Sequence, residues 1–149
     1  MTKLQKRILA NFTVVMVITV AAVVGMVDLK NQVNRSESMR AMENLGRVVS
    51  DYKQKNGSIP PESYVDGIIK SLEGQLRLGN LCYRAQWIAF DSPPDTIIAY
   101  VIKNYHSLFF SPGAIVLRLD GRTEWMDKTS FDKLIASQQT PMELEMTHK

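Results

Sequence analysis

The hydrophobic positions of the chain begin with one unbroken run, Ile8 to Val27 (ILANFTVVMVITVAAVVGMV), which contains no charged residue. At about 1.5 Å per residue, a helix of this length is about 30 Å long, the thickness of a bilayer's hydrocarbon core. Its polar side chains are Asn11, Thr13 and Thr19, and threonine hydroxyls can hydrogen-bond to carbonyls of the preceding turn. We therefore interpret this run as a membrane-spanning helix.

After the apolar run, the pattern becomes polar and then amphipathic. Residues 28–38 are polar all round and contain no proline or glycine, which predicts an exposed helical stalk. A stripe with helical spacing follows and should pack against a domain; it consists of Met39, Met42, Leu45, Val49 and Tyr52. Gly57 suits a left-handed helix end, and Ile59-Pro60-Pro61 forces an extended turn. We expect one continuous helix from about Lys6 to Asn56.

The remaining pattern predicts short elements that alternate with turns. Helical spacing over 62–72 predicts a second helix, although Gly67 weakens it. Alternation over Tyr83–Ala89 predicts a half-buried strand, and Thr96–Ile102 is apolar on both faces, as in a central strand. Residues 104–113 read as a loop whose phenylalanines, Phe109 and Phe110, tuck under the sheet.

The C-terminal third contains the most specific hairpin pattern in the chain. Residues 114–119 (AIVLRL) lead into Asp120-Gly121 and then 122–126 (RTEWM). A two-residue Asp-Gly turn is the usual choice, but here it would mix polar and apolar faces. A three-residue loop, Leu119-Asp120-Gly121, sets Ile115 opposite Trp125 and Leu117 opposite Thr123. We prefer this loop because Gly121 then takes the left-handed bulge position, although Arg118 then faces Arg122.

The last part of the chain predicts one more helix and then loses its periodicity. Thr129 or Ser130 can cap this helix, and its buried side would carry Phe131, Leu134 and Ile135. From Gln139 to Lys149 nothing is periodic, so we expect a flexible tail. The chain therefore divides into a basic tail (1–7), a transmembrane helix (8–27), a stalk (28–38), an α+β domain (39–138) and a tail (139–149).

The predicted fold class is α+β, with a long N-terminal helix packed on a small antiparallel sheet. The formal charge of the 149 residues is +3, and the N-terminal Lys3, Lys6 and Arg7 account for it. From Ile8 onward basic and acidic residues balance, which argues against a nucleic-acid partner. The one cysteine, Cys82, excludes an intrachain disulfide. We interpret it as a buried small side chain, with an intermolecular thiol as the alternative.

The apolar run could also be a signal peptide, and as an anchor it could cross the membrane in either direction. Val20-Ala21-Ala22 resembles a signal-peptide cleavage site, but the run continues beyond it, which favours a retained anchor. Basic residues stand on both sides of the run, so the positive-inside count is nearly balanced. We expect the N-terminus to be cytoplasmic, because the tail is short and a domain can translocate regardless of its charges.

Catalytic and metal-binding patterns are weak in this sequence. His106 and His148 lack metal-ligand spacing, and the chain contains no nucleophile elbow, phosphate-binding glycine loop or cysteine pair. We therefore expect no enzyme, no cofactor and no small-molecule substrate. Calcium is a minor alternative, through Asp91 with Asp95 or Asp120 with Asp127, although acidic residues in turns are usually turn chemistry.

The order of these parts resembles the type IV pilin-like proteins and, among them, the pseudopilins of type II secretion. Those proteins have a short basic leader, a glycine and a phenylalanine-threonine start that opens a long apolar helix. Here Phe12, Thr13 and the residues up to Met16 (FTVVM) stand in that place. Many members also close with an aspartate-glycine hairpin that carries a tryptophan, like Asp120, Gly121 and Trp125.

The departures from this pattern concern processing and assembly. Asn11 replaces the glycine before the cleavage point, and Met16 replaces the carboxylate at the fifth mature position. In the family, that carboxylate neutralises a neighbouring subunit's free N-terminal amine. Without cleavage no new amine forms at Phe12, so the two losses agree with each other. In the hairpin, Arg122 stands where many members have histidine.

The resemblance implies a single-pass protein of a bacterial inner membrane with a periplasmic or extracellular domain. Its function would be that of a pilin-like structural subunit or accessory protein of a secretion or pilus system. Its partners would be the membrane, other pilin-like subunits and inner-membrane proteins of the secretion system. The alternative is a membrane-tethered periplasmic binding or scaffolding module, unrelated to filaments.

Overall fold

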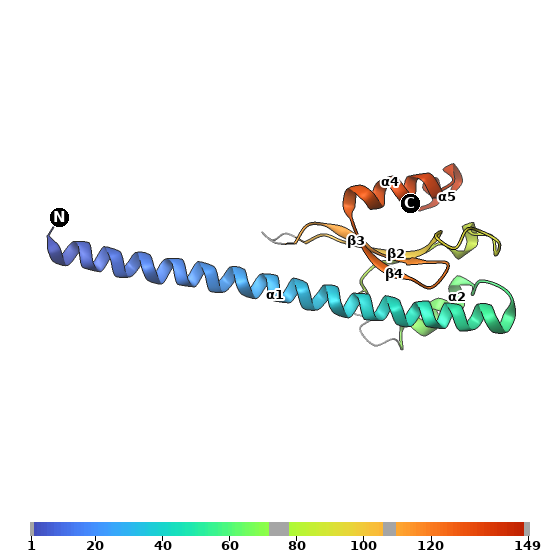
Figure 1. The fold of residues 1–149 in the computed structure, drawn as a ribbon, viewed down its shortest axis with the longest axis horizontal. Coiled ribbons are helices and arrows are strands. Elements are labelled where there is room, and N and C mark those ends of the chain that lie inside the picture. The colour runs from blue at the N-terminus through green and yellow to red at the C-terminus, as the bar shows by residue number, and fades with distance from the viewer. Residues whose placement is uncertain (1, 72–77, 106–109, 148–149) are drawn as a thin grey trace.

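The computed structural model describes residues 2–71, 78–105 and 110–147. One helix, α1 (Lys3–Asn56), projects from the rest of the protein and carries a small α+β domain along its C-terminal half (Figure 1). Thr2 and Gln5 begin α1 with a reciprocal capping box, and Gly57 ends it in the left-handed conformation, with φ 64°. The continuous helix predicted from about Lys6 to Asn56 is confirmed.

The domain contains a four-stranded antiparallel sheet in the order β1-β2-β3-β4, so neighbouring strands follow each other along the chain. Its strands are β1 (Leu81–Tyr83), β2 (Ile97–Lys103), β3 (Gly113–Arg118) and β4 (Thr123–Asp127). The other elements are α2 (Glu62–Ile69), the 3-10 turn η1 (Ala85–Trp87), α4 (Lys128–Gln138) and α5 (Pro141–Thr147). The predicted α+β class is confirmed.

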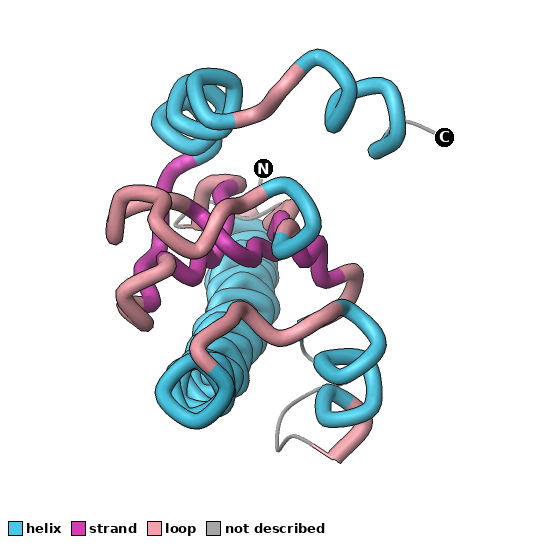
Figure 2. The backbone as a smooth tube through the Cα atoms, turned by 90° about the vertical axis from the view of Figure 1, so that its right-hand side faces the viewer, coloured by secondary structure: helices cyan, strands magenta, loops and turns pink. Residues whose placement is uncertain are grey.

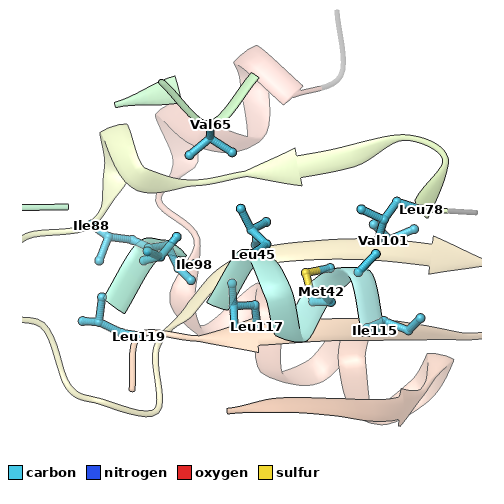
Figure 3. Close-up of a cluster of buried hydrophobic side chains, with 13 residues drawn as sticks. Met42, Leu45, Val65, Leu78, Ile88, Ile98, Val101, Ile115, Leu117 and Leu119 are labelled. Carbon is cyan, nitrogen blue, oxygen red and sulfur yellow. The ribbon is translucent and has the colours of Figure 1, made fainter. Parts of the chain in front are cut away.

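Helices cover both faces of the sheet (Figures 1 and 2). On one face, α1 and α2 enclose the larger core, where Met42 and Leu45 meet Ile98, Ile115 and Leu117 (Figure 3). On the other face, α4 encloses a smaller core, which includes Ile97, Tyr100, Val116, Phe131 and Ile135. The central strand predicted over Thr96–Ile102 is confirmed as β2, which is buried on both faces over Ile97–Val101, whereas Ile102 is exposed.

The hairpin between β3 and β4 has the predicted three-residue loop. Ile115 pairs with Trp125, Leu117 pairs with Thr123, and Gly121 has φ 87°. The expected repulsion between Arg118 and Arg122 is relieved because each guanidinium has a carboxylate. Arg118 donates to Glu124 across the strands, with its Nε 2.6 Å from Oε1. Arg122 donates to Asp120 within the loop, with its Nε 2.6 Å from Oδ2.

The strand predicted over Tyr83–Ala89 is wrong beyond Tyr83. Only Leu81–Tyr83 pair with β2, and the chain then turns at Arg84, where φ is −107° and ψ is 11°, into η1. The alternation of apolar residues therefore does not come from a continuous strand. Pairing ends where the Arg84 side chain is buried in the domain by its ion pair with Glu143.

The ends of the predicted helices also differ from the structure. Asp127, and not Thr129 or Ser130, caps α4, because its carboxylate accepts a hydrogen bond from the Ser130 N–H at 2.9 Å. The tail predicted as flexible contains α5, and Glu143 on that helix is buried. The predicted second helix is confirmed over Glu62–Ile69, whereas Leu72 lies outside the described residues.

Candidate functional site: the apolar half of α1 and its junction with the domain

The apolar residues 8–27 make up most of the N-terminal half of α1, and the domain does not bury their most apolar stretch. Phe12 and Met16 are exposed on this half of α1, which projects away from the domain (Figure 1). The helix is long and apolar enough to cross a membrane. Thr13 and Thr19 donate their hydroxyls to the carbonyls of Leu9 and Val15, each at 2.9 Å. These polar groups are therefore satisfied within the helix, as a bilayer requires.

The residues in the position of a pilin start lie inside this uninterrupted helix. Asn11, Phe12 and Thr13 are consecutive helical residues, and Met16 follows Phe12 by one turn. Lys3, Lys6 and Arg7 are exposed at the N-terminal end of the same helix. The three basic residues, Asn11 and Met16 therefore all lie on one continuous helix.

The stalk is less solvated than the sequence indicates, because one of its faces contacts the domain. The guanidinium carbon of Arg35 lies 4.2 Å above the ring centre of Trp125, close enough for a cation–π interaction. Lys103 donates to Asn34 at 3.4 Å, and the Ser38 side chain is fully buried. Domain contacts therefore begin at about Asn34 instead of Met39, which corrects the expected wet stalk over residues 28–38.

Trp125 is the centre of this junction. Its ring stacks on Tyr105 at a centroid distance of 5.8 Å, and Phe110 packs edge-on against Tyr105 at 5.9 Å. Burial raises the pKa of Tyr105, and the nearby Arg35 cation opposes that rise. Of the two phenylalanines expected under the sheet, Phe110 contacts this aromatic group, and Phe109 lies outside the described residues.

The tip of the hairpin approaches α1 at a second contact, close to Gly46. A Cβ atom on Gly46 would lie 2.9 Å from Leu117 Cδ1 and 3.1 Å from the Gly121 carbonyl oxygen. A side chain at this position would require Leu117 Cδ1 and the Gly121 carbonyl to shift. Gly121 and Trp125 therefore belong to the helix–sheet junction, whereas Asp120 is exposed in the loop and pairs with Arg122. By helical rise, they are about 28 Å or more along α1 from Met16, so the two sets of predicted residues form separate regions.

A buried ion pair is the main polar feature that sequence reasoning missed. Arg84 and Glu143 are both almost fully buried, with Arg84 Nε 2.6 Å from Glu143 Oε1 and Nη2 3.0 Å from Oε2. Arg84 also donates to the carbonyl oxygens of Ile97 at 2.6 Å and Gln138 at 3.1 Å. The pair joins β1, β2, α4 and α5. No local pattern indicates it, because its partners are 59 residues apart.

The aspartates weighed for calcium have other roles where the structure shows their contacts. Asp120 pairs with Arg122, and Asp127 caps α4. Among the described residues, no group of three or more histidine, cysteine, aspartate or glutamate side chains is placed to hold a metal ion. Cys82 is half-buried on β1 and packs against the smaller core.

Comparison of the chain with protein-family models, with curated proteins and with solved structures finds no match in any of the three.

Proposed function

We propose that this chain is a membrane-anchored, pilin-like structural subunit or accessory protein of a secretion or pilus system, and that it acts through protein–protein contacts. The observation that supports this proposal is the division of α1. Its first half is apolar and uncovered, and its second half forms the core of an antiparallel domain without any break between them. Such a helix can join lateral contacts within a membrane to contacts of the domain outside it.

The proposed topology places Lys3, Lys6 and Arg7 on the cytoplasmic side of a bacterial inner membrane. The domain that begins near Asn34 then lies in the periplasm or outside the cell. Asn11 and Met16 support an uncleaved accessory role, because the glycine for cleavage and the carboxylate for amine neutralisation are both missing. No catalytic step is part of this proposal.

The proposal can be tested by replacing residues 8–27 with an unrelated apolar helix of the same length. A pilin-like subunit uses the surface of this helix for contacts, so the replacement should abolish cross-links to membrane partners while the domain stays folded. A tethered binding module needs the helix only as an anchor. If partner cross-links survive the replacement, the alternative module is correct and the pilin-like role is wrong.

Processing provides a second test of the same proposal. Co-expression with a prepilin peptidase should leave the native chain at full length, because Asn11 replaces the required glycine. The Asn11→Gly variant is the matched control, and intact-mass measurement distinguishes the two products. Loss of residues 1–11 from the native chain would contradict the uncleaved role.

A further inference from the structure

The edge of β1 that does not face β2 borders a cavity of about 280 Å³. Its lining includes Leu81, Cys82 and Tyr83, the three consecutive residues of β1. Leu81 and Tyr83 pack against the core on the α1 face, whereas Cys82 packs against the core on the α4 face. Because residues from both faces line the same cavity, the cavity runs along the edge of the strand and not over one face of the sheet.

The main-chain pairing shows which groups of β1 point into this cavity. The Arg84 N–H donates to the Ile98 carbonyl at 2.8 Å, so Arg84 directs its backbone toward β2. Backbone direction alternates along a strand, and Cys82 therefore also faces β2, opposite Tyr100. Leu81 and Tyr83 consequently direct their N–H and C=O groups away from β2. In the described chain β1 is the first strand of the sheet, so these groups are not paired by another strand.

The walls of the cavity come from the helical layers on the two sides of the sheet. Glu62 at the start of α2 stands on one side, and Glu143 with Met146 of α5 stands on the other. Trp87 of η1 adds a half-buried aromatic surface. The Arg84–Glu143 ion pair fixes α5 in place, so this buried pair builds one wall of the cavity.

We propose that the β1 edge, between α2 and α5, is a docking groove for an extended peptide segment of a partner protein, which adds a strand beside Leu81–Tyr83. Outward N–H and C=O groups at alternate residues recognise an extended backbone. Met146 and Trp87 offer apolar contact to side chains of the added strand. Among the described lining residues, Arg84 forms an ion pair with Glu143, and Glu62 adds a negative charge at the start of α2. The favoured segment therefore alternates apolar and basic residues.

This inference is independent of the proposed pilin-like role, because it concerns the domain and not the membrane-spanning half of α1. A tethered binding module would use the same groove. The two proposals can therefore fail separately: the helix replacement tests the first, and peptide binding to the intact chain tests the second.

The experiment uses the full chain in lipid nanodiscs and a synthetic seven-residue peptide in which valine alternates with lysine. The matched control is the same peptide with alternate backbone nitrogens methylated, which removes hydrogen-bond donors and keeps every side chain. The unmodified peptide should bind about tenfold more tightly than the methylated one, because two or more backbone hydrogen bonds are lost. Equal affinities, or no binding of either peptide, would overturn the proposal.

Hydrogen exchange on the same complex locates the added strand without a mutation. Saturation with the peptide should slow exchange of the Leu81 and Tyr83 amide protons, because they gain acceptors. The Cys82 amide already faces β2 and serves as an internal reference. Slowing at β4 with no change at Leu81 and Tyr83 would place the peptide elsewhere and overturn the assignment.

The charge preference has its own pair of variants. Glu62→Gln should weaken the lysine peptide about threefold, as expected for loss of an exposed ion pair, and should leave a valine–glutamate peptide no weaker. Asp66→Asn is the control on the same helix, because Asp66 does not line the cavity. Equal effects of the two variants would contradict a basic partner segment.

Discussion

The two halves of α1 have the same backbone and opposite relations to their surroundings. In the half that begins the chain, apolar side chains cover every side of the helix and none of the apolar window is buried. In the second half, apolar residues form one stripe, and Met42 and Leu45 on that stripe are fully buried. An apolar residue of α1 therefore stabilises the domain only where the helix has a sheet beside it, and the proposed membrane would bury the others.

The largest expected effect tests the buried half. Leu45→Ala should lower the free energy of unfolding of the domain by about 2–5 kcal/mol, because it leaves a cavity in the larger core. Val17→Ala, in the exposed apolar half, should leave the domain's stability unchanged. Urea unfolding of the full chain in detergent, followed by tryptophan fluorescence, measures both variants because Trp87 and Trp125 lie in the domain. Equal losses would contradict the division of α1.

The next effect tests the exposed half. Val17→Arg should disfavour membrane insertion by about 2.5–3.5 kcal/mol, the cost of an arginine near the centre of a membrane-spanning helix. Gln32→Arg on the exposed stalk provides the same charge outside the predicted span. Alkaline extraction of membranes should release the first variant and retain the second. Retention of both would argue against a membrane-spanning role for residues 8–27.

A smaller effect concerns the boundary between the two halves. Arg35→Ala removes the cation above Trp125 and should lower the domain's stability by about 0.5–2 kcal/mol. Arg40→Ala is the control on the same helix, because Arg40 is exposed. The tryptophan emission of the Arg35 variant should also shift, because the Trp125 ring loses the guanidinium above it. If the two variants behave alike, Arg35 does not hold the junction.

The smallest expected effect is a pH dependence on the far side of the sheet. Hydrogen bonds from Ser130 lower the pKa of Asp127 below its ordinary value of 3.8. The folded form thus binds this proton less readily than the unfolded form, so the carboxylate stabilises the domain above that value. This contribution should fall as the pH drops through the lowered pKa. In the Asp127→Asn variant, the melting temperature should depend less on pH below the ordinary aspartate value. An unchanged dependence would contradict the capping role of Asp127.

The parts of the fold that could be predicted from the sequence are those with a local physical cause. Gly121 and the alternation around it determine the hairpin register, because a one-residue slip would move every apolar side chain to the wrong face. The stripe from Met42 to Val49 could also be predicted, because residues three and four apart lie on one face of a helix. These features need only residues close together in the chain.

The parts that could not be predicted depend on residues far apart in the chain. Arg84 ends β1 because Glu143, 59 residues later, and two backbone carbonyls accept its hydrogen bonds. Arg35 is half-buried because its guanidinium packs over the Trp125 ring. Both arginines resemble ordinary solvated residues in a local window. The candidate groove at the β1 edge could not be predicted either, because one of its walls depends on the Arg84–Glu143 pair.

The unbroken helix has a consequence for how the domain faces its neighbours. α1 is about 80 Å long and contains 54 residues, and no loop between its two halves allows them to swivel. Each residue turns a helix by about 100°, so the number of residues between Val27 and Asn34 sets the rotation of the domain about the axis of α1 relative to the apolar half. Inserting one residue there would rotate the domain about a quarter turn and leave its fold intact. Under the proposed membrane topology, residues 28–33 would thus determine which side of the domain meets a neighbouring subunit.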